Sequence, residues 1–261
     1  MSGMKKLVLL LSLLLYGTGL AVPAGATGAA PGISAEDALR LLKEGHARYL
    51  EGQPRHPHQN RERRALTTAQ GQHPLAAVLS CSDSRVPVEI IFDQGIGDLF
   101  VVRVAGNVAA TDEIGSLEYT VDHLATPVVV VLGHTHCGAV SAVLDDAKLP
   151  PHIADLVSPI EPAVAKARQD NPEAARDVLL KAAITNNVWQ AIEDMLRQSP
   201  IIREKVRDDQ VKVVGALYDI DSGQVQWLGP HPEQAKLVGA KKGAGKGGNK
   251  GRKAKKSKVE E

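Results

Sequence analysis

Four short, predominantly apolar runs, in which polar residues do not alternate with apolar ones, constrain the fold of this 261-residue chain more than any other feature. They cover residues 75–80, 99–104, 127–132 and 211–217. A strand with one solvent-exposed face alternates apolar and polar residues, whereas strands buried on both faces of a parallel sheet are apolar throughout. The four runs therefore predict buried, parallel strands.

Helical patterns separate the later runs and cover residues 112–124, 139–146 and most of 152–208. Strands that alternate with helices form right-handed crossovers in layered α/β folds. After the last run, a turn at residues 221–223 leads into residues 224–228, which we expect to form an antiparallel edge strand. The predicted fold is thus α/β, with a central, mostly parallel β-sheet of four strands plus a short antiparallel edge strand, flanked by helices.

The amino-terminal segment, residues 1–26, has the features of a secretory signal peptide. Lys5 and Lys6 precede an apolar run at residues 7–16, and Ala24-Gly25-Ala26 offers a cleavage site of the A-x-A type. The run is shorter than the roughly 20 residues that span a bilayer, so cleavage is favoured over the alternative of an uncleaved membrane anchor. We expect a periplasmic or secreted protein.

Residues 27–235 are expected to form a single folded domain. A helix is predicted over residues 34–51, because Ser34 and Asp37 resemble a capping box and the apolar residues after them follow a helical spacing. Residues 52–63 are rich in Pro, His and Arg, and we expect an irregular connector there.

The last segment, residues 236–261, has a different composition. It holds ten basic and two acidic residues, whereas residues 27–235 hold 19 basic and 28 acidic residues. Because it is dominated by Gly and Lys, it cannot bury enough apolar surface to fold, and we predict a disordered basic tail. The tail is either simply solvated or in contact with an anionic surface. We expect no specific nucleic acid partner, since the leader predicts export and base-stacking aromatic residues make up only 3% of the chain.

Two short polar segments follow buried strands directly. Cys81, Asp83 and Arg85 come after the first apolar run, and His134 and Cys137 come after the third. Open α/β sheets bind their ligands at the carboxyl ends of parallel strands, so these side chains are candidates for one site. Thiolate and imidazole ligands suit zinc, and three protein ligands leave a fourth position open, as in catalytic zinc sites.

The same residues allow a second interpretation. A secreted protein with two cysteines often forms one disulfide, here Cys81–Cys137, and composition alone favours this interpretation slightly. The neighbouring Asp83 and Arg85 favour a catalytic site, because a guanidinium can hold a carboxylate in a fixed bidentate pair. Asp83 held in this way could accept a hydrogen bond from a zinc-bound hydroxide, or the pair could simply brace the loop. His136 ranks below His134 as a ligand, since it points elsewhere when His134 and Cys137 share one turn.

The sequence resembles the β-class carbonic anhydrases. The pattern Cys81-x-Asp83-x-Arg85 followed by His134-x-x-Cys137 is similar to the zinc signature of that family. Further matching segments are Val86-Pro87, Phe92-Asp93-Gln94-Gly95, Gly-Asp-Leu-Phe-Val-Val-Arg at 97–103, Ala105-Gly106-Asn107 and Gly-Ser-Leu-Glu-Tyr at 115–119. The similarity extends over residues 35–228, and the leader and the tail lie outside it.

The resemblance implies one Zn²⁺ per subunit, bound by Cys81, His134 and Cys137. It implies that a zinc-bound hydroxide hydrates CO₂ reversibly to bicarbonate and a proton. Asp83 and Arg85 would be the catalytic dyad, and the substrate-binding residues would be Gln72, Phe100 and Tyr119. Part of that pocket comes from a neighbouring subunit in the family, so a homodimer or tetramer is expected, with the helix at 34–51 wrapped around the partner.

Three alternatives stay open at this stage. A hydrolase acting on CS₂ or COS would use a very similar zinc site. A non-catalytic protein that binds zinc or an anion could share the fold, although it would not need to keep Asp83, Arg85 and Gln72. A secreted α/β protein with a Cys81–Cys137 disulfide would lack the metal altogether.

Overall fold

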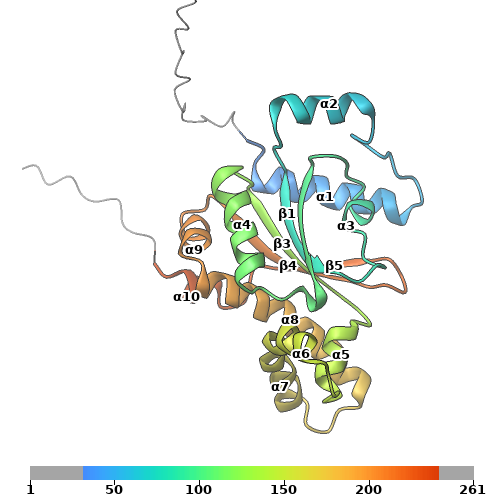
Figure 1. Cartoon of the computed structure of the whole chain (residues 1–261), viewed down its shortest axis with the longest axis vertical. Coiled ribbons are helices and arrows are strands. Elements are labelled where there is room, and N and C mark those ends of the chain that lie inside the picture. Colours follow the sequence, from blue (N-terminus) through green and yellow to red (C-terminus); the bar gives the residue numbers. More distant parts are fainter. Residues whose placement is uncertain (1–31, 241–261) are drawn as a thin grey trace, which may run out of the picture. The chain divides into compact units, whose positions relative to one another are not determined.

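The computed structural model describes residues 32–240 of the chain. The predicted signal peptide and residues 241–261 of the predicted tail lie outside the described residues. Five strands form one sheet in the order β2-β1-β3-β4-β5, in which only the pairing of β4 with β5 is antiparallel (Figure 1). The strands are β1 (Ala76–Cys81), β2 (Leu99–Val104), β3 (Val128–His134), β4 (Lys212–Tyr218) and β5 (Val225–Gly229). The predicted α/β sheet is therefore confirmed.

Strands β1 and β3 extend beyond the ends of the apolar runs that predicted them. The third run ends at Leu132, yet β3 continues to His134 because Gly133 and His134 pair with Leu217 and Tyr218 of β4. In the same way, β1 ends on Cys81. Cys81 and His134 are thus the last residues of strands in the sheet, and neither lies in the loop that follows.

The helices of the described residues cover both faces of the sheet and its carboxyl end. They are α1 (Ala35–Leu50), α2 (Arg61–Gln70), α3 (Val88–Ile91), α4 (Thr111–His123), α5 (Gly138–Leu144), α6 (Pro151–Val157), α7 (Glu161–Asp170), α8 (Arg176–Gln198), α9 (Pro200–Arg207) and α10 (Gln234–Val238). Two short 3₁₀ turns join them, η1 (Ala105–Asn107) and η2 (Ser158–Ile160). The helices predicted over residues 34–51, 112–124, 139–146 and 152–208 are confirmed, the last as α6 to α9.

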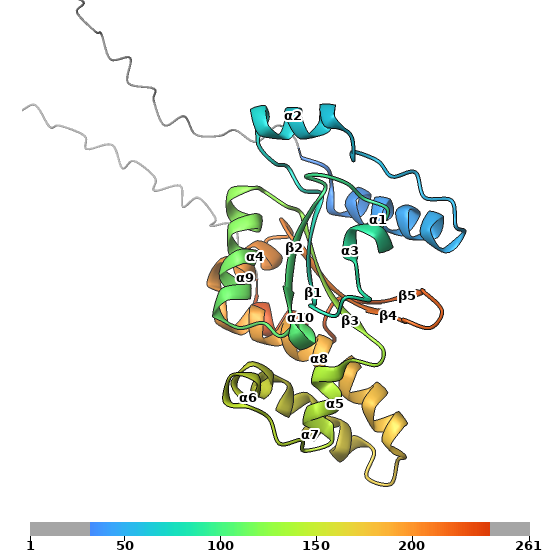
Figure 2. The same cartoon turned by 45° about the vertical axis from the view of Figure 1, so that its right-hand side comes forward.

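Alternate residues of the strands belong to two separate hydrophobic cores. Leu79 and Val131 pack with residues of α4, α8 and α9 on one face, while Val78 and Val130 pack with residues of α1 and α3 on the other. Figure 2 shows these helices on opposite sides of the sheet. Strands β1 and β3 are buried at every position, which explains why their sequences are apolar rather than alternating. Strand β2 differs from the prediction, because it lies at the edge of the sheet, where its residues are half-buried and Arg103 is exposed.

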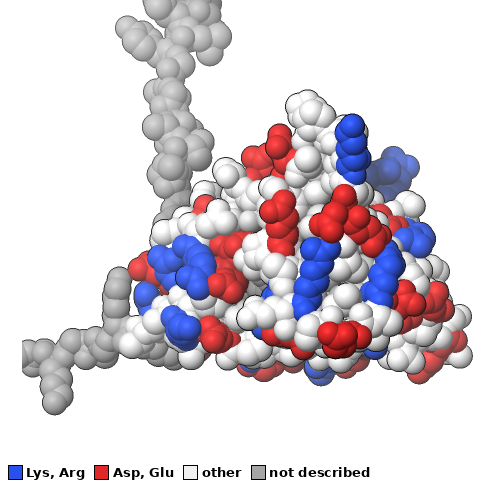
Figure 3. All heavy atoms as spheres, turned by 90° about the horizontal axis from the view of Figure 1, so that it is seen from below, with Lys and Arg blue, Asp and Glu red and all other residues white. Residues whose placement is uncertain are grey.

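A third core lies at the carboxyl ends of β1 and β3. It joins Cys81 and Cys137 to apolar residues of α5, α6, α7 and α8. Figure 3 shows the molecule from below the view of Figure 1, and on that face acidic and basic side chains are interspersed. Helix α7, which contributes to this third core, carries Lys166 and Arg168, and these pair with Asp170 and Asp146. Such a mixed surface produces no broad positive field. Within residues 32–240, no helix combines the length and apolarity needed to cross a membrane.

Two helices correct the sequence analysis. The connector predicted over residues 52–63 ends in α2, which starts at Arg61 after the side chain of Asn60 accepts a hydrogen bond from the Arg63 amide. None of the residues of α2 is buried, so it has no apolar stripe by which the sequence could reveal it. Near the carboxyl terminus, α10 includes residues 236–238, which are the first residues of the predicted tail. Leu237 packs against the core that includes residues of α4, α8 and α9.

Candidate metal centre

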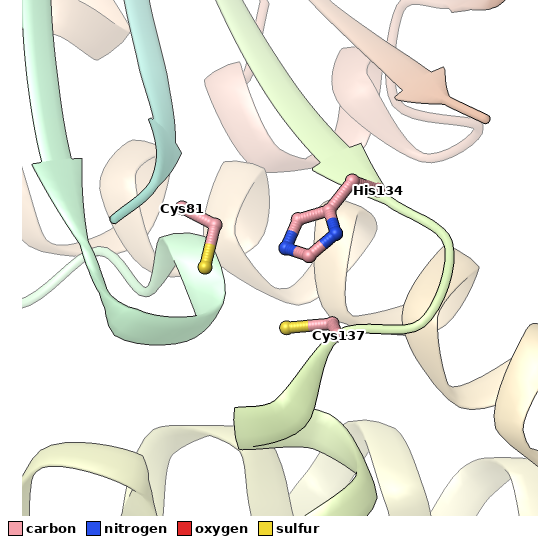
Figure 4. A group of neighbouring side chains, drawn as sticks. All are labelled: Cys81, His134 and Cys137. Carbon is pink, nitrogen blue, oxygen red and sulfur yellow. The ribbon is translucent and has the colours of Figure 1, made fainter. Parts of the chain in front are cut away.

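Three potential metal ligands meet at the carboxyl end of the sheet. Cys81 is the last residue of β1, His134 is the last residue of β3, and Cys137 precedes the first turn of α5. Their ligand atoms all lie within 4.8 Å of one another, and Figure 4 shows the two sulfur atoms and one ring nitrogen facing a common point. The structure therefore brings together the three ligands that the sequence predicted.

The hydrogen bonds of His134 fit a metal ligand. Its ring lies 0% exposed, and its Nδ1 is 2.8 Å from the carbonyl oxygen of Thr135, which fixes Nδ1 as the donor. The lone pair then lies on Nε2, and this buried atom has no hydrogen-bond partner among the described residues. A buried polar atom without a partner is costly, and a bound cation would satisfy it. The donor set of two thiols and one imidazole fits zinc.

The two cysteines are free thiols, which contradicts the disulfide interpretation. Hydrogen bonding from Cys137 lowers the pKa of the Cys81 thiol to about 4, and the Gly106 amide donates to the same sulfur. The same hydrogen bond with Cys81 raises the pKa of Cys137, as do its burial and the repulsion between two thiolates. The Cys81 thiol thus loses its proton readily, whereas the Cys137 thiol keeps its proton. A divalent cation between the sulfur atoms would remove the repulsion and favour loss of both protons.

Asp83 and Arg85 form the predicted bidentate pair. Arg85 donates from Nε to Oδ1 of Asp83 at 3.0 Å and from Nη2 to Oδ2 at 2.7 Å. Hydrogen bonding from Arg85 holds the pKa of Asp83 well below its usual range, although partial burial opposes this shift. Oδ2 of Asp83 lies 4.0 Å from Nε2 of His134, so the ionised carboxylate stands beside the three ligand atoms.

A second contact of Arg85 ties the two polar segments together. Its Nη2 also donates to the carbonyl oxygen of His136, at 3.2 Å, across the loop between β3 and α5. The imidazole of His136 points away from the ligands and pairs with Asp221, with Nε2 and Oδ2 2.8 Å apart. His136 is therefore not part of the ligand group, as its position in the turn predicted.

The structure does not bring the predicted substrate residues to the ligands of the same chain. Gln72 precedes β1, and Phe100 pairs with Ala77 near the start of that strand, whereas Cys81 ends it. At about 3.3 Å per residue, Phe100 lies roughly 13 Å along β2 from the level of Cys81. Phe100 and Tyr119 do meet each other, with ring centroids 6.2 Å apart.

Three residues around the ligands were not assigned a role from the sequence. The amide of Gly106 donates to Sγ of Cys81 at 3.3 Å, and Asn187, which is buried on α8, donates to the carbonyl oxygen of Gly106 at 2.7 Å. Arg103 donates to the backbone carbonyls of Cys81 and Asp83. The motifs at 97–103 and 105–107 pointed to this region, but only the fold shows which atoms touch the ligands.

Comparisons with a family model and with curated proteins both match carbonic anhydrases. The family model described as carbonic anhydrase matches residues 76–225. Carbonic anhydrase 2 of Mycobacterium tuberculosis is 39% identical over 191 residues, which cover 72% of this chain and 89% of the relative. A carbonic anhydrase of Mycolicibacterium smegmatis is 38% identical over 193 residues, which cover 72% and 91% of the two chains.

Solved structures of β-carbonic anhydrases also match this chain. The β-carbonic anhydrase CafA of Aspergillus fumigatus matches with a TM-score of 0.61 and 27% identity, covering 78% of this chain and 95% of that chain. One of two tetrameric β-carbonic anhydrases from Sordaria macrospora matches with a TM-score of 0.58 and 26% identity, covering 74% and 96%. With the sheet order, the ligand group and the Asp83–Arg85 pair all present, the chain belongs to the β-class carbonic anhydrases.

Proposed function

We propose that this carbonic anhydrase hydrates CO₂ reversibly at one zinc ion per subunit, held by Cys81, His134 and Cys137. The observation that carries the proposal is the unpartnered Nε2 of His134 beside two buried thiols. Three protein ligands leave a fourth tetrahedral position open, as is typical of catalytic zinc. When bound, zinc lowers the pKa of a water molecule toward neutrality and so supplies the nucleophile for CO₂.

Asp83 and Arg85 act as the dyad beside the open position. Because Arg85 keeps the carboxylate ionised, Asp83 accepts a hydrogen bond at neutral pH and cannot donate one. Its Oδ2, 4.0 Å from Nε2 of His134, is close enough to hold the proton of an oxygen that attacks CO₂. Arg85 fixes both carboxylate oxygens, so the acceptor is already oriented before the substrate arrives.

The test is stopped-flow CO₂ hydration by the zinc-loaded protein from about pH 6.5 to about pH 9, with zinc content measured in parallel. Cys137→Ser is the matched control. We expect rapid hydration that rises with pH in the wild type, and loss of both zinc and hydration in the variant. A wild type that binds one zinc per chain and hydrates no CO₂ contradicts the proposal, and turnover of CS₂ or COS in its place would identify the sister activity.

The substrate pocket is proposed to be completed by a second copy of the chain. This is supported by the separation of Phe100 and Tyr119 from the ligands of their own chain, and by the exposure of Tyr119, which is 46% exposed. Strand β2, which carries Phe100, lies at the edge of the sheet. Helix α1 packs its apolar face on its own sheet, so any contact of α1 with a partner involves its outward face.

Subunit mixing tests this arrangement. Phe100→Ala removes a pocket residue, and Cys137→Ser removes a metal ligand. If the pocket is shared, a mixed dimer contains one site in which the metal ligands and Phe100 are both intact, so mixing two weakly active variants restores activity. If each chain builds its own pocket, no mixture exceeds the two variants measured separately.

Export and the role of the tail are proposed from the sequence, because both segments lie outside the described residues. The positive residues, apolar run and A-x-A site of residues 1–26 support a cleaved leader. Fractionation of cells that express the full chain should place the processed protein outside the inner membrane. Deletion of residues 241–261 should change its retention on an anionic surface and leave turnover intact. Retention of an unprocessed chain in the cytosol would contradict export.

A further inference from the structure

Arg103 holds the backbone of the turn that carries both a metal ligand and the dyad carboxylate. It lies in β2, directly opposite Ser80 of β1. Its Nε donates to the carbonyl oxygen of Cys81 at 3.0 Å, and its Nη2 donates to the carbonyl oxygen of Asp83 at 2.6 Å. One guanidinium thus bridges two carbonyls that lie on either side of Ser82.

The turn has little other support from the sheet. Strand β1 ends at Cys81, and after it the amide of Ser82 donates to the carbonyl oxygen of Val104 at 3.1 Å. With the two bonds from Arg103, three hydrogen bonds connect β2 to residues 81–83. Without Arg103, only the Ser82 amide would join this turn to β2, and the backbone at Asp83 would lose its contact with that strand.

The position of the Asp83 carboxylate depends on this backbone. Arg85 holds the side chain of Asp83 from two residues away on the same turn, and its own tie to another segment is the bond to the His136 carbonyl in the loop between β3 and α5. Strand β2 is the part of the sheet to which the backbone of the turn is bonded. Because Oδ2 of Asp83 lies 4.0 Å from Nε2 of His134, a shift of about 1 Å in the turn changes its relation to the metal ligands substantially.

The chemistry of the contact requires arginine. A guanidinium is planar, remains charged and presents its donors in a rigid fork, so it can bond two carbonyls at once. A lysine in the same place keeps the charge but offers one flexible ammonium group. Both hydrogen bonds of Arg103 go to backbone oxygens, so the contact fixes the course of the chain rather than neutralising a carboxylate.

We propose that Arg103 is a positioning residue for CO₂ hydration, which fixes the turn of residues 81–83 to β2 and thereby aims the Asp83 carboxylate at the open metal position. The inference rests on the function proposed above for Asp83. It differs from a purely structural role, in which Arg103 would stabilise the edge of the sheet without affecting the dyad.

The experiment compares Arg103→Ala and Arg103→Lys with the wild type as zinc-loaded full chains. We expect both variants to keep one zinc per chain and to lose about 10- to 100-fold in kcat, because the acceptor is displaced while the ligands remain. Hydrogen exchange of the amides of residues 82–85 should accelerate. Free guanidinium ion should restore part of the kcat of Arg103→Ala, whereas methylammonium should not.

Arg197→Ala is the matched control, because Arg197 is an exposed arginine of α8 that pairs with Glu193 one helical turn away. It should change neither kcat nor the exchange of residues 82–85. The inference is overturned if Arg103→Lys retains the full wild-type kcat, if the variants lose activity only in proportion to lost zinc, or if the exchange of residues 82–85 is unchanged. A wild type without CO₂ hydration would instead refute the proposed function, while the exchange measurement would still test the contact.

Discussion

Replacing Gly106 by alanine should damage both the fold and the metal centre. Gly106 has φ +75°, in the left-handed region that disfavours side chains. A Cβ added there would lie 2.6 Å from Cδ1 of Ile160 and 3.2 Å from Cβ of Ala139. The Gly106 amide also donates to Sγ of Cys81, so a shift of this residue changes the surroundings of a metal ligand.

The expected cost has two parts that can be separated. The left-handed conformation costs an alanine about 1–2 kcal/mol. Crowding in a packed core typically costs about 1–3 kcal/mol more. The gain from restricting the unfolded chain, about 0.4–1 kcal/mol, offsets a part of this sum. We therefore expect Gly106→Ala to lower the free energy of unfolding by about 2–4 kcal/mol.

Gly52 provides the matched control. It has φ +66°, and no atom lies within 4 Å of the position its Cβ would occupy. Gly52→Ala therefore carries the conformational cost without the crowding. Urea unfolding followed by far-ultraviolet circular dichroism, at a fixed zinc concentration, measures both variants, and competition with a chromophoric chelator measures their zinc affinity. We expect a loss of zinc affinity of about 10- to 100-fold for Gly106→Ala only.

A second substitution identifies the crowded contact. Ile160→Val removes Cδ1, the atom that the new Cβ would meet at 2.6 Å. The double variant should be less destabilised than the sum of the two single variants, by at least about 0.5 kcal/mol. The reasoning is refuted if Gly106→Ala costs no more than Gly52→Ala, or if the effects of Gly106→Ala and Ile160→Val simply add.

Three further predictions concern the metal, the dyad and acid stability. Removal of zinc with a chelator should expose two reactive thiols for each zinc released; a thiol titration that finds none would indicate a disulfide. Asp83→Asn should keep its zinc and lose about 100-fold or more in kcat, because an amide cannot replace the ionised acceptor; a wild-type kcat would exclude Asp83 from the mechanism. Burial of Asp93 raises its pKa, but the amides of Arg55 and His56 and the guanidinium of Arg48 lower it more, so the folded pKa lies below the unfolded value of 3.8. Ionised Asp93 therefore stabilises the fold above that value, and this stabilisation is lost as pH falls through the folded pKa. In Asp93→Asn, the free energy of unfolding measured in urea should fall less steeply as the pH is lowered; a fall as steep as that of the wild type would contradict this.

The sequence by itself determined the sheet and the metal ligands. Strands β1 and β3 could be predicted because burial on both faces leaves a local signal, an apolar run. Cys81, His134 and Cys137 could be predicted because each lies at or just after the end of such a run, where parallel sheets collect their functional groups. Helix α2 had no comparable signal, since none of its residues is buried.

The tertiary structure alone decided how the ligands are surrounded. The amide of Gly106 reaches Cys81 across 25 residues of chain, and the guanidinium of Arg103 reaches the carbonyls of Cys81 and Asp83 across 22 and 20 residues. Such contacts follow from the register of β1 with β2, which the composition of either strand does not specify. The separation of Phe100 from the ligands follows from the same register. Residue types and short spacings are encoded locally, whereas the atoms that orient a site come from distant segments that only the packed sheet brings together.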